Sequence, residues 1–106
     1  MAKYSIGLDY GTLSVRALMV DIHTGEEVAT SVYEYTHGVM ETRIPCGKKL
    51  PSGWALQDPQ DYMDGLIETV RSVMKQSNAY PEEIVGIGVD FSSSTVLSVS
   101  ADKTPL

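Results

Sequence analysis

The sequence predicts an α/β protein with a mixed β-sheet in the element order β-β-β-α-β. Three observations predict this fold class. Apolar segments rich in β-branched residues follow one another early in the chain, with short turns between them. A stripe of apolar residues at helical spacing comes next, and a nearly continuous apolar run, "IVGIGVDF", follows it. No later helix is seen to cover the second face of the sheet, so we expect an incomplete fold.

The first three strands are expected at residues 4–9, 14–21 and 27–35. A short turn at 10–13 joins the first two strands, and the glycine turn "HTGE" joins the second to the third. Successive strands joined by tight turns pair antiparallel, so these three segments should form a meander.

Residues 37–57 show no clean period and contain several glycine and proline residues. We therefore expect a long loop, and long loops inside compact domains tend to be functional. A helix should follow at residues 58–77, because Asp58 suits the N-cap, Pro59 the first helical position and Asp61 the first turn. The core-facing stripe of this helix is expected to contain Tyr62, Met63, Leu66, Ile67, Val70, Val73 and Met74.

The segment 84–91 is apolar almost throughout, which is typical of a central strand covered on both faces. Because a helix crossover precedes this segment, it should run parallel to the first strand. A further strand is expected to begin near residue 95 and to end in the turn "ADKT".

The composition restricts the class of protein. The 106 residues carry a formal net charge of −6, with 42% hydrophobic and 21% charged residues, which fits one globular unit. The acidic balance argues against a nucleic-acid partner and against an anionic membrane surface. The single cysteine, Cys46, excludes an internal disulfide, and the N-terminal stretch lacks the apolar core of a signal peptide. We expect a cytoplasmic protein without a membrane-spanning segment.

Two acids fall at the carboxyl ends of the expected parallel strands, Asp9 after the first and Asp90 after the last. Ligands gather at this edge of such sheets, and adjacent strands would bring the two acids close together. Gly11 lets a phosphate approach the backbone, while amides and hydroxyls of Gly11, Thr12 and Ser14 can donate to its oxygens. An acid beside such a turn suits a cation, so Asp9 is expected to hold Mg²⁺ through water.

Arg16 lies on the strand that leaves this turn and could neutralise charge that grows on a transferred phosphoryl group. Simpler interpretations stay open. The D-x-G-T stretch is also a common hairpin turn, in which Asp9 caps the turn and Gly11 supplies a positive φ. Arg16 could be a surface strand residue, and Asp90 could cap the "SSST" turn without touching a ligand.

The stretches "IGLDYGTLSVRALMVD", "TGE", "WALQDPQDYMDGL" and "GIGVDFSSSTVL" occur in this order along the chain. Together they resemble the FGGY family of carbohydrate kinases, and the resemblance covers essentially all 106 residues. It implies a ribonuclease H-like (actin-like ATPase) fold, of which residues 1–106 would be the N-terminal part of the first kinase domain. Within the family, "HGVMETRIP", "WALQDP" and "GIGVDF" are most similar to members that phosphorylate ribulose.

The resemblance implies roles for particular positions. Asp9 would be the metal-binding acid of the family's first phosphate motif. The phosphate-binding positions would be Gly11, Thr12, Ser14 and Arg16. Leu13 stands where some relatives have a hydroxyl residue, so a side-chain contact to phosphate is lost there.

Two further stretches match the family. The segment just after the fourth strand falls where the family contacts its sugar, and its residues are Ser93, Ser94, Thr95 and Val96. Trp54, Gln57 and Asp58 match a "W-x-x-Q-D-P" stretch whose expected role is structural. Trp54 could also form a wall of the sugar pocket.

The resemblance also implies the reaction. The full-length enzyme would transfer the γ-phosphoryl group of ATP to a hydroxyl of a ketopentose such as L-ribulose, a step of L-arabinose catabolism, with ATP and Mg²⁺ as cofactors. The family's general base, second phosphate motif and adenosine pocket lie in later sequence, so no residue here is expected to be the catalytic base. Phosphoryl transfer needs two substrates and a metal held between two lobes, so the isolated chain should be inactive.

Two other classes of protein stay open. A metal-dependent nuclease of ribonuclease H type also has carboxylates after its first and fourth strands, and Glu68 on the helix would be its third acid. The net charge and the glycine turn disfavour this interpretation. The other class is a non-catalytic actin-like or chaperone-like nucleotide-binding module. An uncovered sheet face and the apolar stripe would favour a homo-oligomer of an isolated fragment.

Overall fold

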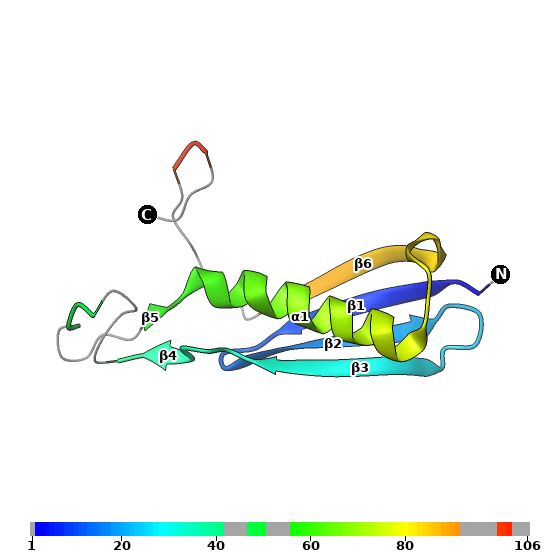
Figure 1. The fold of residues 1–106 in the computed structure, drawn as a ribbon, viewed down its shortest axis with the longest axis horizontal. Helices are drawn as coiled ribbons and strands as arrows, with labels where there is room; N and C mark the ends of the chain where they lie inside the picture. The colour runs from blue at the N-terminus through cyan, green and yellow to red at the C-terminus, as the bar shows by residue number, and fades with distance from the viewer. Residues whose placement is uncertain (1, 42–46, 51–55, 92–99, 103–106) are drawn as a thin grey trace.

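The computed structural model describes residues 2–41, 47–50, 56–91 and 100–102. A single sheet has the strand order β3-β2-β1-β6, and one helix, α1, lies across one of its faces (Figure 1). The main elements are β1 (Tyr4–Tyr10), β2 (Ser14–Asp21), β3 (Glu27–Glu34), α1 (Pro59–Ser77) and β6 (Ile84–Phe91). A 3-10 turn, η1 (Pro81–Glu83), leads into β6. The predicted mixed sheet and its element order are confirmed.

Strands β1 to β3 form the predicted antiparallel meander. β1 pairs with β2 over its whole length, from Tyr4 opposite Asp21 to Tyr10 opposite Val15. The turn between β2 and β3 contains Gly25 with a φ of 74°, a conformation that glycine adopts without steric cost. Side chains alternate between the two faces along each strand, and the face toward α1 carries the core. Its buried hydrophobic cluster consists of Ile6, Leu8, Ala17, Met19, Ala29 and Val73.

Helix α1 begins and ends where the sequence predicts. The Asp58 carboxylate accepts a hydrogen bond of 3.0 Å from the backbone N–H of Gln60, and Pro59 occupies the first turn. This is a standard N-cap, which satisfies one of the free amides of the first turn. Asn78 ends the helix in the left-handed conformation, with a φ of 55°.

The buried face of α1 differs from the predicted stripe. The buried helix residues are Asp61, Gly65, Thr69 and Val73. Met63 and Ile67, which were expected in the core, are 51% and 43% exposed, so the prediction is wrong for these two residues. The reason is the close approach at Gly65, where an added Cβ would lie 2.4 Å from Cγ1 of Val15 on β2. Because α1 contacts the sheet through Gly65, the side chains of Met63 and Ile67 point away from the sheet.

The expected long loop at 37–57 contains two short strands. β4 (Val39–Met40) pairs antiparallel with β5 (Leu56–Gln57), with Val39 opposite Gln57. The prediction of a loop without strands is therefore wrong at its two ends. Two-residue strands have no detectable period, and their pairing depends on the helix and sheet that bring the loop ends together. Residues 42–46 and 51–55 of this segment lie outside the described residues.

Strand β6 runs parallel to β1, as predicted. It forms the edge of the described sheet, and Val89 and Phe91 are 55% and 65% exposed, so the expected cover on both faces is absent from the described part. Helix α1 packs on β2 and β3 and barely reaches β1. The expected strand near residue 95 lies outside the described residues, while Ala101 and Asp102 form a turn.

The molecule is elongated, with a radius of gyration of 16.4 Å and extents of 54 × 28 × 23 Å. A compact domain of this length would have a radius of gyration of about 13 Å.

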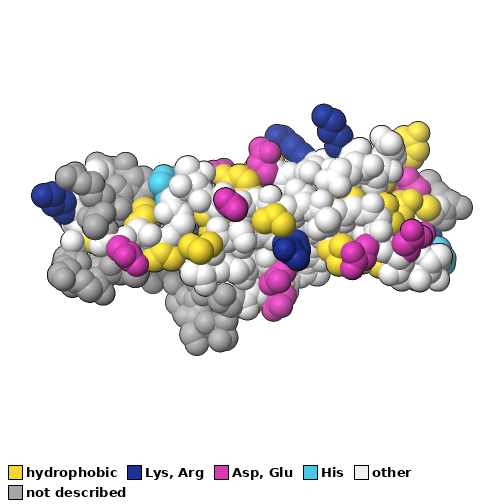
Figure 2. Space-filling model, turned by 90° about the horizontal axis from the view of Figure 1, so that it is seen from below, with side chains coloured by type: hydrophobic (Ala, Val, Ile, Leu, Met, Phe, Trp, Pro, Cys, Tyr) yellow, Lys and Arg dark blue, Asp and Glu magenta, His cyan; other side chains and the backbone are white. Residues whose placement is uncertain are grey.

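The face seen from below carries hydrophobic side chains in separate groups, with acidic side chains among them (Figure 2). In the described ranges, no helix combines the length and apolar character that a membrane span requires.

Candidate functional site

Asp9, Arg16 and Asp90 form a row across the sheet at the edge where β1 and β6 end. Asp9 is in register with Arg16 of β2 on one side and with Asp90 of β6 on the other. Neighbours in register project from the same face of a sheet. Leu8, which precedes Asp9, belongs to the core under α1, so alternation puts this row on the opposite face. The prediction that the strands bring the two acids together is confirmed.

The row offers groups of both charges. Asp9 and Asp90 are exposed and supply carboxylate oxygens, the ligands that Mg²⁺ prefers. Arg16 is also exposed, and no described carboxylate lies within ion-pair distance of it. An uncommitted guanidinium can bind two phosphate oxygens at once. These residues therefore fit a divalent ion together with a phosphate group.

The turn between β1 and β2 closes with a hydrogen bond of 2.8 Å from the Gly11 amide to the Ser14 carbonyl. The glycines with positive φ in the described ranges are Gly25, Gly38 and Gly47, so the interpretation that Gly11 supplies a positive φ is wrong. A Cβ at position 11 would lie 3.4 Å from the Ser14 carbonyl oxygen, which is close but tolerated. The absence of a side chain at Gly11 thus matters for access to the backbone and not for the turn conformation.

The carbonyl groups of the turn are held by residues from distant parts of the chain. The Tyr35 hydroxyl donates to the Gly11 carbonyl at 3.0 Å, and the Tyr35 amide donates to the Leu13 carbonyl at 2.9 Å. Nε2 of Gln57 donates to the Thr12 carbonyl at 2.7 Å. The amides of Thr12 and Leu13, by contrast, have no acceptor among the residues that the structure describes. They are available to an anion.

Three tyrosines pack edge to face behind the turn. The ring of Tyr62 lies 6.0 Å from that of Tyr10 and 5.6 Å from that of Tyr35, at interplanar angles of 90° and 76°. Such arrangements are the favoured geometry of aromatic pairs. The Tyr10 hydroxyl donates to the Tyr62 carbonyl at 3.0 Å, and the Tyr62 hydroxyl donates to Oε1 of Gln57. The sequence analysis missed this cluster, because its members are far apart in the chain.

The titration of Tyr35 provides a prediction. Burial, followed by the neighbouring Tyr62 and Tyr10, raises the pKa of Tyr35 to about 12. A raised pKa means that the folded state favours the protonated hydroxyl. The resulting gain in folding free energy is complete below the ordinary tyrosine pKa of about 10, and it is lost as the pH rises through about 12. Burial also raises the pKa values of Tyr10 and Tyr62, so tyrosinate absorbance of the full-length protein should lose one of its late-titrating groups in Tyr35→Phe. Identical titration curves for the two proteins would contradict the assignment.

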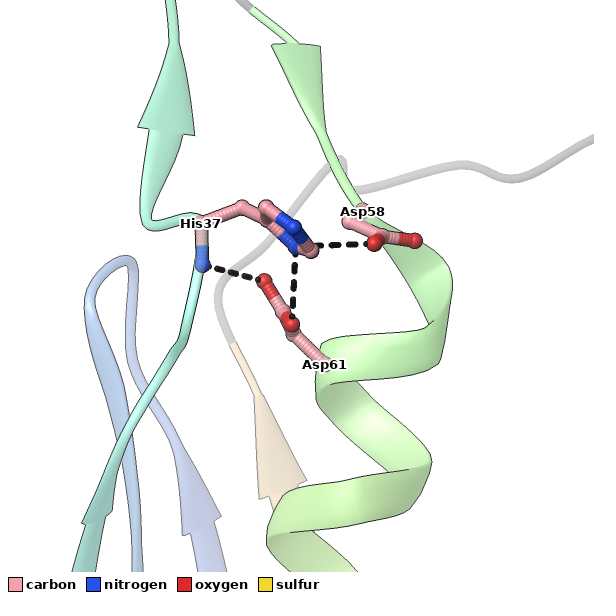
Figure 3. A group of neighbouring side chains, drawn as sticks. All are labelled: His37, Asp58 and Asp61. Atoms are coloured by element: carbon pink, nitrogen blue, oxygen red, sulfur yellow. Dashed lines mark hydrogen bonds and ion pairs between the residues drawn. The ribbon is translucent and has the colours of Figure 1, made fainter. Parts of the chain in front are cut away.

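His37, Asp58 and Asp61 form a cluster that joins the segment after β3 to the start of α1 (Figure 3). Nδ1 of His37 lies 2.9 Å from Oδ2 of Asp58 and 3.2 Å from Oδ1 of Asp61. The other oxygen of Asp61 accepts the backbone N–H of His37 at 3.1 Å. The side chain of Asp61 is only 3% exposed, so these hydrogen bonds satisfy a buried carboxylate.

The three ligand atoms of this cluster lie within 4.8 Å of one another, which is close enough for one divalent ion. Each carboxylate, however, already has one oxygen bound to a backbone amide and the other facing Nδ1 of His37. The hydrogen bonds account for the arrangement without an ion. The cluster therefore fastens two segments of the chain together. The sequence analysis assigned Asp61 to the first helical turn and did not find its histidine partner.

Replacing Asp61 by alanine should destabilise the protein. The change removes the carboxylate that accepts hydrogen bonds from the backbone N–H and from Nδ1 of His37, and hydrogen bonds to a charged group typically contribute about 1.5–3 kcal/mol. Thermal unfolding of the full-length protein measures the effect. Asp64→Ala is the matched control, because Asp64 lies on the same helix and accepts only an exposed hydrogen bond from Gln60. Equal stability of the two variants would show that the cluster does not fasten the segments.

A hollow of about 330 Å³ opens beside the turn. Its lining includes Leu13 and Ser14 from the turn, Glu34 and Tyr35 from the end of β3, and Gly38. This volume lies at the lower end of the roughly 300–1,000 Å³ of small-molecule sites. The hollow lies between the end of the turn and the end of β3, and Gly11 and Thr12 are not part of its lining.

The nuclease interpretation lacks its third acid. Glu68 is exposed on α1, which covers the face of the sheet opposite to the row of Asp9 and Asp90. The two carboxylates and Glu68 therefore lie on different sides of the sheet. Within the described residues, no other acid joins Asp9 and Asp90 to complete a three-acid metal site.

The predicted sugar-binding residues Ser93, Ser94, Thr95 and Val96 lie outside the described residues, and so does Trp54. Their roles stay predictions. Gln57 and Asp58 of the same "W-x-x-Q-D-P" stretch are described. They hold the turn and cap α1, respectively.

Solved structures with the same arrangement of elements are sugar kinases. Gluconate kinase from Lactobacillus acidophilus superposes with a TM-score of 0.79 at 23% identity, over 100% of this chain and 19% of that chain. Xylulose kinase from the same organism superposes with a TM-score of 0.76 at 23% identity, over 98% of this chain and 18% of that chain. The chain therefore has part of the actin-like ATPase fold, as predicted.

The sequence matches the family model for the N-terminal domain of the FGGY carbohydrate kinases over residues 4–106. The chain belongs to the FGGY family of carbohydrate kinases. A ribulokinase of Bacillus licheniformis is 55% identical over 95 residues, which are 89% of this chain and 17% of the relative. A ribulokinase of Halalkalibacterium halodurans is 45% identical over 105 residues, 98% of this chain and 19% of the relative. The chain thus spans less than a fifth of the length of these relatives.

Proposed function

We propose that this chain is the N-terminal part of a cytoplasmic kinase that transfers the γ-phosphoryl group of ATP to a hydroxyl of L-ribulose. The similarity to ribulokinases supports the sugar, because two relatives with this name are 55% and 45% identical to the chain. Xylulose and gluconate kinases share the fold at only 23% identity, so their substrates are weaker candidates.

The observation that carries the proposal is the row of Asp9, Arg16 and Asp90 beside a turn with two uncommitted amides. Phosphoryl transfer is catalysed mainly by positioning and by charge stabilisation, and these groups can supply both. Carboxylates and a guanidinium on one face of a sheet match a magnesium-bound polyphosphate in charge.

Each residue has a role in this proposal. The carboxylate of Asp9, with Asp90 beside it, would hold Mg²⁺ through water. Bound Mg²⁺ would neutralise charge on the phosphate oxygens of ATP. Gly11 leaves the backbone accessible because it has no side chain, while its own N–H closes the turn on the Ser14 carbonyl. The Thr12 amide and the hydroxyls of Thr12 and Ser14 bind phosphate oxygens, and Arg16 stabilises the charge of the transferred group.

The remaining parts of the reaction are assigned to other segments. The residues from Ser93 to Val96 would contact the sugar, and the general base would come from sequence beyond this chain. Residues 1–106 form the N-terminal part of the first kinase domain in this proposal. The chain alone would therefore be inactive, since half of one lobe cannot position both substrates.

Steady-state assays of the full-length protein test the proposal. ATP consumption is measured with L-ribulose, D-xylulose and D-gluconate at matched concentrations, with and without Mg²⁺. We expect Mg²⁺-dependent turnover with the highest kcat/KM for L-ribulose. Preference for D-xylulose or D-gluconate would refute the assignment of the sugar, and turnover with none of these would refute the proposed reaction.

A further inference from the structure

The turn between β1 and β2 has three consecutive carbonyl groups that accept hydrogen bonds from two residues elsewhere in the chain. Tyr35 holds the first and third carbonyls, through its hydroxyl to Gly11 and its amide to Leu13. Gln57 holds the second, at Thr12, with a distance of 2.7 Å. Tyr35 and Gln57 are 24 and 45 residues from the positions that their side chains bind. The turn is therefore set by tertiary contacts.

Fixing these carbonyls also fixes the amides of the turn. A trans peptide unit is planar, and its C=O and N–H groups point in opposite directions. The described chain has no cis peptide bond, so the Gly11 carbonyl shares a plane with the Thr12 N–H, and the Thr12 carbonyl with the Leu13 N–H. The bond from Tyr35 to the Gly11 carbonyl therefore fixes the direction of the Thr12 N–H, and the bond from Gln57 to the Thr12 carbonyl fixes that of the Leu13 N–H. These amides are the two that have no acceptor in the described part of the chain.

Tyr35 and Gln57 are themselves held in place. Tyr35 is 7% exposed, and its ring packs against the edge of Tyr62. The hydroxyl of Tyr62 donates to Oε1 of Gln57, so the amide group of Gln57 must present Nε2 to Thr12. Both bonds to the turn therefore come from side chains with little rotational freedom.

The cluster of His37, Asp58 and Asp61 joins the two segments that carry these side chains. His37 follows Tyr35 by two residues, and Asp58 follows Gln57 directly. The contacts of Nδ1 with both carboxylates keep the segment after β3 against the start of α1. Tyr35 and Gln57 thus approach the turn from two segments that this cluster joins.

We propose that Tyr35 and Gln57 are positioning residues that orient the Thr12 and Leu13 amides toward the phosphates of bound ATP. The inference rests on the proposed function, since it assigns the turn to the nucleotide. Neither side chain touches the substrate in this account. Each acts by keeping one peptide plane in the orientation that an anion requires.

Two variants of the full-length enzyme remove the bonds to the turn while keeping side-chain size. Tyr35→Phe deletes the hydroxyl, and Gln57→Met deletes the amide. Each should weaken the equilibrium affinity for MgATP by about 3- to 10-fold, the usual size for one hydrogen bond, and the double variant by more than either. The KM for the sugar and the melting temperature should change little.

Matched controls are present in the chain. Nε2 of Gln76 donates to the Thr30 carbonyl on β3 at 2.9 Å, so Gln76→Met removes the same kind of bond at a distance from the turn. The Tyr33 hydroxyl bonds to Oγ1 of Thr36 at the surface, so Tyr33→Phe removes a hydroxyl without touching the turn. Both controls should bind MgATP as the wild type does.

The results separate the two proposals. Wild-type affinity for MgATP in Tyr35→Phe and Gln57→Met would overturn the positioning role, and so would an equal loss of ATP and sugar affinity, which indicates general damage. MgATP binding is measured without sugar, so it tests the positioning role whichever sugar is phosphorylated. Failure of the wild type to phosphorylate L-ribulose would overturn only the proposed function.

Discussion

Replacing Asp9 by alanine in the full-length protein is expected to lower kcat by on the order of 10²–10³-fold, as is typical when one preorganised charge-stabilising group is removed. The affinity for the sugar should change little. Asp9 lies in the row with Arg16 and Asp90. In our proposal its carboxylate binds the cation of ATP and does not contact the sugar. A loss in kcat without a change in sugar KM marks a contribution to the transition state.

Two further variants make this result specific. Asp9→Asn keeps the shape of the side chain and removes its charge, so it should resemble Asp9→Ala if the carboxylate serves a cation. Glu27→Gln removes an exposed carboxylate near the start of β3, at the opposite end of the sheet from Asp9, and should leave kcat unchanged. Unchanged turnover in Asp9→Ala, or a loss confined to sugar affinity, would contradict the proposed role.

Gly65→Ala is also expected to lower stability. An added Cβ would lie 2.4 Å from Cγ1 of Val15 and 3.1 Å from Cδ1 of Tyr33, and Val15 is fully buried. Overpacking of this kind typically costs about 1–3 kcal/mol, because the helix or the strand must shift. The better helix propensity of alanine, about 1 kcal/mol, offsets only part of this loss. Thermal unfolding of the full-length protein measures the change.

A second substitution tests the cause of that loss. Val15→Ala removes the methyl group that the new Cβ would meet, so the double variant Val15→Ala with Gly65→Ala should be more stable than the sum of the single changes predicts. Glu68→Ala, at an exposed position of α1, is the control and should stay within about 0.5 kcal/mol of the wild type. Wild-type stability of Gly65→Ala would contradict the close contact between α1 and β2 at this position.

The strands and the ends of the helix could be predicted from the sequence because their signals are local. The apolar segments 14–21 and 84–91 have the predicted bounds, and Asp58 with Pro59 marks the start of α1. The parallel pairing of β6 follows from the preceding helix crossover. Once β1 and β6 are parallel neighbours, their terminal acids must meet, so the row of Asp9 and Asp90 was predictable as well.

The buried face of α1 was less predictable, because hydrophobicity alone does not decide which residues face a sheet. Gly65 and Thr69 allow the helix to come close to β2, and this contact leaves Met63 and Ile67 exposed. The side chains of β6 have the composition of a strand covered on both faces, yet Val89 and Phe91 are exposed in the described part of the chain.

The support behind the turn could not be predicted, because it consists of long-range contacts between polar residues. The sequence analysis assigned Gln57 to a structural stretch and found no role for Tyr35 or His37. No periodicity relates these residues to Gly11 or Thr12, and the pairing appears only when β3 and the start of α1 are placed beside the turn.

The central claim is that the turn after β1 binds the phosphates of ATP and that the Asp9 carboxylate binds the cation that accompanies them. Equilibrium binding of ATP to full-length wild type and Asp9→Asn, each with and without Mg²⁺, tests it most directly. We predict that Mg²⁺ strengthens ATP binding to the wild type and that this gain disappears in Asp9→Asn. An equal gain from Mg²⁺ in both proteins would show that the cation lies elsewhere, and it would contradict the claim.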